Sequence, residues 1–373
     1  MKLKLDEYFN STAKYYELFD ELFYYDPKGK KEVLSLLGIN YNSYRVEKTR
    51  SDVNNSNISL LLNYFNINPI ENERKLEYER IISKIYYTSY YKQLEELRKL
   101  LNEIEVYIYE NNYLKPILIL MKTIGYICLG LSLEELKILK TDLDYLNIFN
   151  HNYFTNEFKL FQMTILYYFD FKIKEIKLKN LVLENPKYKW FYLNMIASHY
   201  YLHKNDEKAL IYYLEVLEEY KKNINVERLM NTISNISCIY NLMGKYDSSL
   251  NVSSSAIEYA YSTKKDLYIS YLTQHYLFSN YMLDRKDAIL DFLNIVLYDK
   301  EQLNIVSAMM SILILFEDEP LRANELIESF NYDHNIRAIQ IYLNTNNKEI
   351  LDTIVSKPYF KKIVNKLKKR NTT

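Results

Sequence analysis

A helix-pair pattern that occurs twice between about residues 188 and 256 constrains the fold of this chain more than any other feature. Each copy places a bulky residue before a bulky–small pair and an aromatic residue, and a short turn leads to a small–aromatic–small series. The first copy consists of Leu193, Ile196, Ala197, Tyr200, Ala209, Tyr213 and Val216, and the second of Ile233, Ile236, Ser237, Tyr240, Gly244, Tyr246, Ser249, Ser253 and Ala256. Small residues allow two antiparallel helices to cross closely, while aromatic residues fill the remaining gaps.

The scarcity of glycine and proline supports an all-α fold. The 373 residues include only 5 Gly and 6 Pro, whereas parallel sheets, hairpins and phosphate-binding loops require more glycine. Hydrophobic residues make up 48% of the chain, which is enough for a continuous core. We therefore expect an all-α protein in which amphipathic helices alternate with short polar turns.

The twin pattern resembles the tetratricopeptide repeat (TPR), whose helix pairs stack into a solenoid with a curved groove. A third copy between residues 271 and 297 is degenerate, and the segment from Glu71 to Asn150 matches no repeat cleanly. We expect a TPR-like solenoid over residues 69–373, after a domain boundary at Pro69.

Residues 29–50 resemble a helix-turn-helix. Gly38 occupies the turn, where a positive φ is needed, and Asn40 is the expected N-cap of the second helix. Leu34 stands where a small residue is usual, and Glu47 near a position that is usually apolar. Residues 1–68 are therefore expected to form a DNA-binding domain, and a plain helical cap is the alternative.

In a helix-turn-helix, the second helix enters the major groove and basic side chains contact phosphates. The residues expected to reach base edges are Tyr41, Asn42, Ser43 and Arg45. Those expected to contact phosphates are Lys30, Lys31, Lys48 and Arg50. Because the net charge of the chain is zero, we expect any DNA contact to depend on the local excess of basic residues in this segment.

The combination of an N-terminal helix-turn-helix and degenerate repeats resembles the peptide-responsive TPR regulators of Gram-positive bacteria and their phages. This RRNPP group includes the Rgg, PlcR, NprR, PrgX and Rap proteins and the arbitrium receptor AimR. The resemblance implies a cytosolic homodimer that binds operator DNA and a short signalling peptide. A Rap-like adaptor that binds a response regulator, and a TPR scaffold without a ligand, are the alternatives.

Carboxamides on the first helix of each repeat are expected to bind an extended peptide, because an amide both donates and accepts hydrogen bonds. Arg228 is the expected partner of a peptide carboxylate. The candidates are Asn194, Ser198, Tyr201, Arg228, Asn231, Asn235, Asn241, Gln274 and Asn280. Asparagine is common in this chain, so some of these residues are instead expected to be solvated or to cap helices.

Other features favour a non-enzymatic protein of the cytoplasm without a cofactor. Phosphate-loop, nucleophile-elbow and Cys-x-x-Cys motifs are lacking, and the pair His199 and His203 lacks a third metal ligand. Cys128 and Cys238 lie in apolar helical segments, as expected in a reducing compartment. The apolar stretch at residues 117–131 contains Lys122 and is too short to span a membrane. The basic residues at 357–370 are expected to be a solvated last helix.

Overall fold

A computed structural model describes residues 3, 5–10, 12–50, 55–130, 137–149, 152–169, 173–222, 225–263, 266–296, 303–354 and 358–370. The regular structure of these residues is helical, apart from an isolated bridge between Asn68 and Asn112. The all-α prediction is therefore confirmed. Contacts divide the chain into two compact units, residues 1–199 and 200–373, with the division inside α13.

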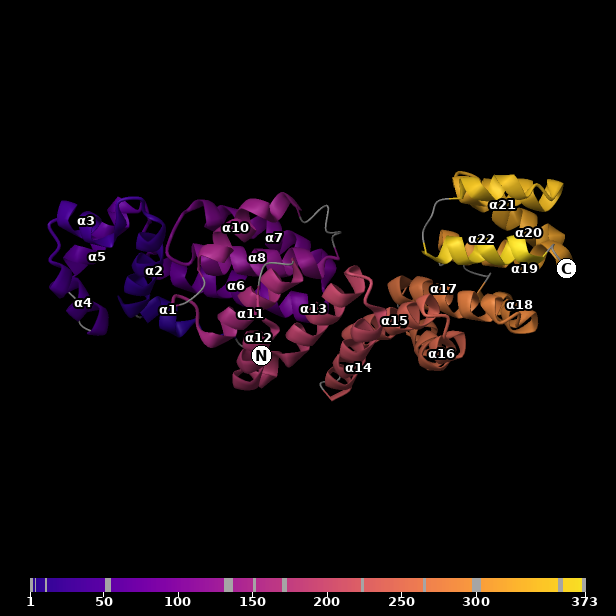
Figure 1. Cartoon of the computed structure of the whole chain (residues 1–373), viewed down its shortest axis with the longest axis horizontal. Helices are drawn as coiled ribbons and strands as arrows, with labels where there is room; N and C mark the ends of the chain where they lie inside the picture. Colours follow the sequence, from indigo (N-terminus) through magenta and orange to yellow (C-terminus); the bar gives the residue numbers. More distant parts are fainter. Residues whose placement is uncertain are drawn as a thin grey trace. The chain divides into compact units, whose positions relative to one another are not determined.

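The first unit begins with a lobe of short helices, coloured indigo and violet in Figure 1. Its helices are α1 (Asp6–Asn10), α2 (Thr12–Tyr25), α3 (Gly29–Leu36), α4 (Tyr41–Thr49) and α5 (Asn55–Tyr64). Buried side chains from α2–α5 form one apolar cluster, which includes Phe19, Val33, Tyr44 and Leu61. Leu34 belongs to this cluster and is 1% exposed, so the larger side chain is accommodated between the helices.

The remainder of the first unit consists of longer helices. They are η1 (Asn72–Arg74), α6 (Lys75–Tyr91), α7 (Leu94–Tyr109), α8 (Lys115–Cys128), η2 (Lys137–Leu139), α10 (Lys140–Ile148), α11 (Asn156–Tyr168), α12 (Glu175–Glu184), η3 (Pro186–Tyr188) and α13 (Lys189–Leu202). The expected boundary at Pro69 lies within this unit, and hydrogen bonds cross it. For example, the backbone N–H of Asn68 donates to the carbonyl of Asn111 at 3.0 Å.

The second unit contains the repeated helix pairs and a C-terminal group of helices. Its elements after α13 are α14 (Asp206–Lys222), α15 (Val226–Leu242), α16 (Tyr246–Ser262), α17 (Asp266–Met282), α18 (Lys286–Val296), α19 (Ile305–Asp318), α20 (Pro320–Ser329), α21 (His334–Thr345), η5 (Lys348–Thr353) and α22 (Pro358–Arg370). Residues from α17 to α22 share one large apolar cluster.

The turns within three successive helix pairs have the same geometry. Lys204, Gly244 and Asp284, which are 40 residues apart, adopt φ values of 58°, 78° and 58°. In each turn the next N–H donates to the carbonyl five residues earlier, over 2.9, 2.8 and 3.0 Å. This is the Schellman bond, which satisfies a helix-end carbonyl and favours a left-handed residue. The degenerate third copy thus closes its helix pair in the same way as the first two.

Candidate functional site

The turn between α3 and α4 has the predicted geometry. Gly38 adopts a φ of 69°, and the N–H of Ile39 donates to the carbonyl of Leu34 at 2.8 Å. The side-chain oxygen of Asn40 accepts from the N–H groups of Asn42 and Ser43, at 2.8 and 3.3 Å. Two of the orphan donors at the start of α4 are therefore satisfied by this cap.

The first turns of α4 present polar side chains to solvent. Tyr44 is fully buried and anchors the helix, and its hydroxyl donates to the carboxylate of Asp20 at 3.0 Å. The four residues expected to reach base edges are all exposed: Tyr41, Asn42, Ser43 and Arg45. This part of the site therefore has an accessible surface.

The four residues expected to contact phosphates fall into two groups. Lys31 and Arg50 are exposed, whereas the ammonium groups of Lys30 and Lys48 both lie 2.5 Å from carboxylate oxygens of Asp20. Burial opposes ionisation of Asp20, but the hydrogen bonds and charges of the two lysines outweigh it and lower the pKa of this carboxyl. A phosphate must compete with Asp20 for both of these lysines.

Glu47 makes polar contacts at a position where an apolar residue was the norm. Its carboxylate accepts from the hydroxyl of Tyr16 at 2.5 Å and from the side-chain amide of Asn57 at 2.8 and 2.9 Å. It thereby joins α2, α4 and α5. The carboxylate thus adds polar contacts between three helices that also share an apolar cluster.

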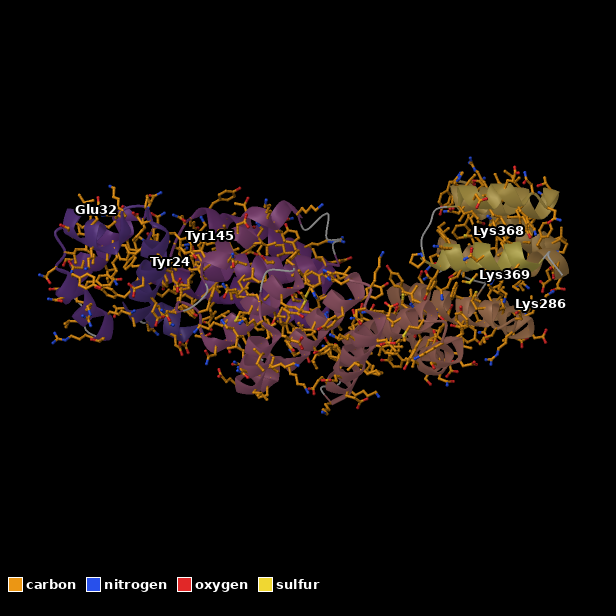
Figure 2. All side chains as sticks on the ribbon, in the orientation of Figure 1. Tyr24, Glu32, Tyr145, Lys286, Lys368 and Lys369 are labelled. Carbon is orange, nitrogen blue, oxygen red and sulfur yellow. The ribbon has the colours of Figure 1, made fainter. Side chains whose placement is uncertain are left out.

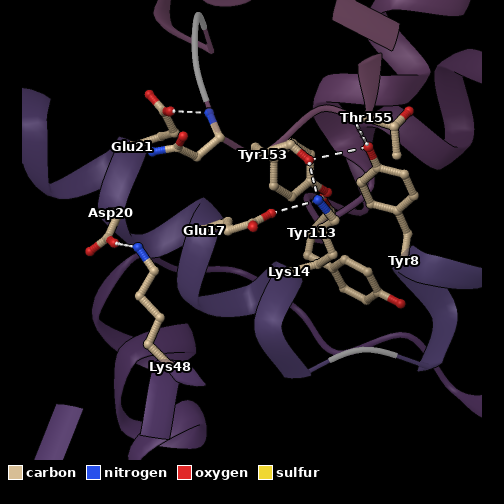
Figure 3. A network of polar contacts seen from close by, with 10 residues as sticks. Tyr8, Lys14, Glu17, Asp20, Glu21, Lys48, Tyr113, Tyr153 and Thr155 are labelled. Carbon is tan, nitrogen blue, oxygen red and sulfur yellow. Dashed lines mark hydrogen bonds and ion pairs between the residues drawn. The ribbon is translucent and has the colours of Figure 1, made fainter. Parts of the chain in front are cut away.

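A network around α1 and α2 fixes the lobe to the rest of the first unit (Figure 3). The buried hydroxyl of Tyr8 donates to the carbonyl of Tyr153 at 3.2 Å and accepts from the N–H of Thr155 at 2.8 Å. Glu21 accepts from the N–H of Asn152 at 3.0 Å. Burial raises the pKa of Tyr8, so its hydroxyl stays protonated in this network. The lobe is thus bonded to the body of its unit by more than the chain connection.

In the second unit, side chains from α15 and α17 form a face that includes several predicted peptide contacts. We call the partly exposed residues Asn231, Asn235, Cys238, Leu242, Tyr271 and Gln274 the α15–α17 face. A cavity of about 370 Å³ opens on this face. It is lined by Tyr201, Cys238, Leu242, Tyr271, Gln274, Asn304, Ile305, Val306, Pro358, Tyr359 and Phe360.

Three of the predicted peptide contacts have buried side chains in this structure, which differs from the expectation that they face a groove. Arg228, Asn241 and Asn280 are 3%, 0% and 2% exposed. The amide of Asn280 donates to the carbonyl of Tyr276 at 3.1 Å, within its own helix. Helical periodicity places a residue on a face, but it does not show which other element covers that face.

The remaining peptide candidates are partly exposed. Asn194 and Ser198 lie on the part of α13 that belongs to the first unit. The hydroxyl of Tyr201 lies 3.6 Å from the Sγ atom of Cys238 at the cavity. Asn231 and Asn235 lie on α15, and Gln274 contributes to the cavity wall. The cavity therefore brings together two of the predicted residues, Tyr201 and Gln274.

The last helix, α22, is not simply solvated as predicted. Its apolar residues Tyr359, Phe360, Ile363 and Leu367 are 0–5% exposed and belong to the core cluster. Lys368, labelled in Figure 2, forms an ion pair with Asp352 of η5. Lys357 lies outside the described residues. The amphipathic spacing of these apolar residues was visible in the sequence, but the surface that they cover was not.

A buried polar network links α15, α17 and α22. His275 lies 3.1 Å from the Oγ atom of Ser234 through Nε2 and 2.8 Å from the hydroxyl of Tyr359 through Nδ1. The amide of Asn241 donates to the same hydroxyl at 3.2 Å and accepts from Ser279 at 2.7 Å. Burial lowers the pKa of His275 to about 3, so the ring is neutral near pH 7. A single Nε2–H tautomer satisfies these contacts, because Tyr359 then donates to Nδ1 while it accepts from Asn241.

Comparison with protein-family models, curated proteins and solved structures finds no match for this chain. Across the described residues, no helix has both the length and the apolar character required to cross a bilayer. In the described part of the chain, Cys128 and Cys238 form no disulfide.

Proposed function

We propose that this chain is a peptide-controlled transcription regulator. Residues 1–68 would bind operator DNA as a helix-turn-helix, and the TPR-like remainder would bind a short signalling peptide and form a homodimer. The proposal rests on the resemblance to the RRNPP group. The observation that carries its DNA half is the exposed face of α4, where Tyr41, Asn42, Ser43 and Arg45 stand free of the lobe's core.

The geometry of α3 and α4 is compatible with insertion of α4 into a major groove. The cap at Asn40 leaves the first turn of α4 ordered, and the anchor at Tyr44 directs the neighbouring polar residues outward. Arg45 can bind a guanine edge through two donors, while Asn42 can bind an adenine edge. These are the contacts that would give sequence specificity.

A Rap-like adaptor that binds a response-regulator protein is the second candidate. The pairing of Lys30 and Lys48 with Asp20 favours it, because it reduces the positive charge available to a phosphate backbone. The fixed attachment of the lobe through Tyr8 and Glu21 would also suit a surface that docks on another protein.

Selection from random DNA duplexes by the full-length protein separates the two candidates. A regulator should enrich one sequence, and the affinity for it should fall about tenfold or more in Arg45→Ala, as expected for loss of a base contact. Ser35→Ala, an exposed residue on α3, is the matched control and should leave affinity unchanged. Failure to enrich any sequence at moderate salt would reject the DNA-binding proposal.

A further inference from the structure

The first turn of α22 forms one wall of the cavity on the α15–α17 face. Pro358, Tyr359 and Phe360 line it on one side, and Tyr271 and Gln274 of α17 line it on another. Any molecule that fills this cavity therefore contacts α17 and α22 at the same time. The position of α22 and the occupancy of the cavity are physically connected.

Besides the apolar residues that α22 contributes to the core cluster, an aromatic ring contact and two ammonium groups hold it against this face. The ring of Tyr359 stacks on Phe278, with centroids 4.1 Å apart and planes 10° apart. Lys362 donates to the carbonyls of Asn241 and Leu242, both at 2.9 Å. This last contact lies at the C-terminal end of α15.

Lys366 forms the equivalent contact at the end of α17. Its ammonium group donates to the carbonyls of Tyr281 and Met282, at 2.5 and 3.1 Å. The last carbonyls of a helix lack intrahelical partners and carry the negative end of the helix dipole, so a cation is favoured there. Both lysines thus donate to helix-end carbonyls, and water could donate to the same carbonyls if α22 moved away.

We propose that α22 docks reversibly on the α15–α17 face, and that a ligand in the cavity stabilises its docked position. The inference rests on the proposed function, in which the second unit binds a short peptide. A ligand that contacts both helices binds only the docked state, and mass action then shifts the population toward that state. The peptide would be sensed as a change in the order of α22.

The lining indicates which part of a peptide the cavity receives. Most of the lining is apolar, and about 370 Å³ is within the range of small-ligand sites. The carbonyl oxygen of the Gln274 side chain accepts from Asn304 at 2.8 Å, and its NH₂ group has no partner in the described part of the chain. An aliphatic or aromatic side chain would fill the cavity, with an adjoining peptide carbonyl accepting from Gln274.

Hydrogen exchange of the full-length protein, read by mass spectrometry, tests the docking of α22. Tyr359→Ala should accelerate exchange of the α22 amides about tenfold or more and leave α20 and α21 protected, because local opening is independent of global unfolding. Lys361→Ala, an exposed residue of the same helix, is the matched control and should change nothing. Unchanged protection of α22 in Tyr359→Ala, or loss of protection throughout α19–α22 together, overturns the proposal.

Cys238 supplies a second readout on the same face. Its thiol is half-covered beside Tyr201 and Tyr359, and the only other cysteine, Cys128, can be removed as Cys128→Ser. Alkylation of Cys238 by N-ethylmaleimide should be faster in the double variant Lys362→Ala/Lys366→Ala, which retains the Tyr359 ring. An unchanged rate overturns the role assigned to the two lysines.

Single-residue amides serve as probes of the ligand effect. N-acetyl-phenylalaninamide at millimolar concentration should slow exchange of α22 about threefold or more by selective binding to the docked state, and N-acetylglycinamide should not. No slowing, or faster exchange, overturns the coupling between cavity and helix. None of these measurements involves DNA, so their failure is distinguishable from failure of the proposed regulator function.

Discussion

The buried histidine of the second unit makes the stability of this protein sensitive to mild acid. His275 is 3% exposed, and burial lowers its pKa to about 3 from an ordinary value of 6.5. Between these two values the unfolded chain binds a proton that the folded chain excludes. Stability is therefore fully present above pH 6.5 and falls as the pH decreases toward 3.

The size of the effect follows from the difference in pKa. Lowering the pH from 7 to 5 costs about 2 kcal/mol from this residue alone, since each pH unit below 6.5 contributes about 1.4 kcal/mol. For a unit of this size, the midpoint of thermal unfolding should fall by about 4–8 °C. Tyr359 contacts the ring, and Cys238 lies beside Tyr359; burial raises the pKa of both, so they remain neutral throughout this interval.

The assay compares the wild type with His275→Gln by thermal unfolding at several pH values. Glutamine keeps a donor and an acceptor but does not titrate, whereas the carboxylates of the chain titrate equally in both proteins. The variant should lose about 2 kcal/mol less stability than the wild type between pH 7 and pH 5. Equal losses in the two proteins would refute the account of the buried network.

Three further predictions concern the N-terminal lobe. Gly38→Ala should destabilise the lobe by about 1–2 kcal/mol in chemical unfolding, because alanine is strained at a φ of 69°; no loss would contradict that geometry. Asn40→Ala should cost about 1 kcal/mol and accelerate hydrogen exchange at the start of α4, whereas unchanged exchange would show that the cap contributes nothing. Asp20→Asn should release Lys30 and Lys48, lowering stability but raising affinity for DNA at low salt in a filter-binding assay; weaker DNA binding would indicate that the pairing with Asp20 positions these lysines.

Local features of the fold could be predicted from the sequence because short-range chemistry determines them. The turn at Gly38 and the cap at Asn40 depend on residues within a few positions of one another, and both predictions are confirmed. The turns near Lys204, Gly244 and Asp284 agree with the expectation of short polar turns between amphipathic helices, since polar breaks between such segments mark helix ends.

The candidate ligand site was predicted only in part, because residues far away in the sequence pack over it. Asn241 occupies the expected position on α15, but the hydroxyl of Tyr359, 118 residues later, accepts from its amide. In the sequence, His275 is a single histidine in an apolar segment, and no motif marks it as part of a polar network. Its role depends on contacts with Ser234 and Tyr359, which only the structure shows. Periodicity identifies the apolar face of α22, but only tertiary structure shows that this face covers α15 and α17.

The most direct test of the proposed function is the ratio of two affinities measured by fluorescence anisotropy at about 0.15 M salt. One is for the duplex that the full-length protein enriches from random DNA, and the other is for a shuffled duplex of the same composition. If α4 reads the base sequence, the ratio of the two affinities should be about 10³ or more. Arg45→Ala should reduce this ratio, whereas Ser35→Ala should leave it unchanged. A ratio near one in the wild type would contradict the account and leave the protein-binding adaptor as the better explanation of the lobe.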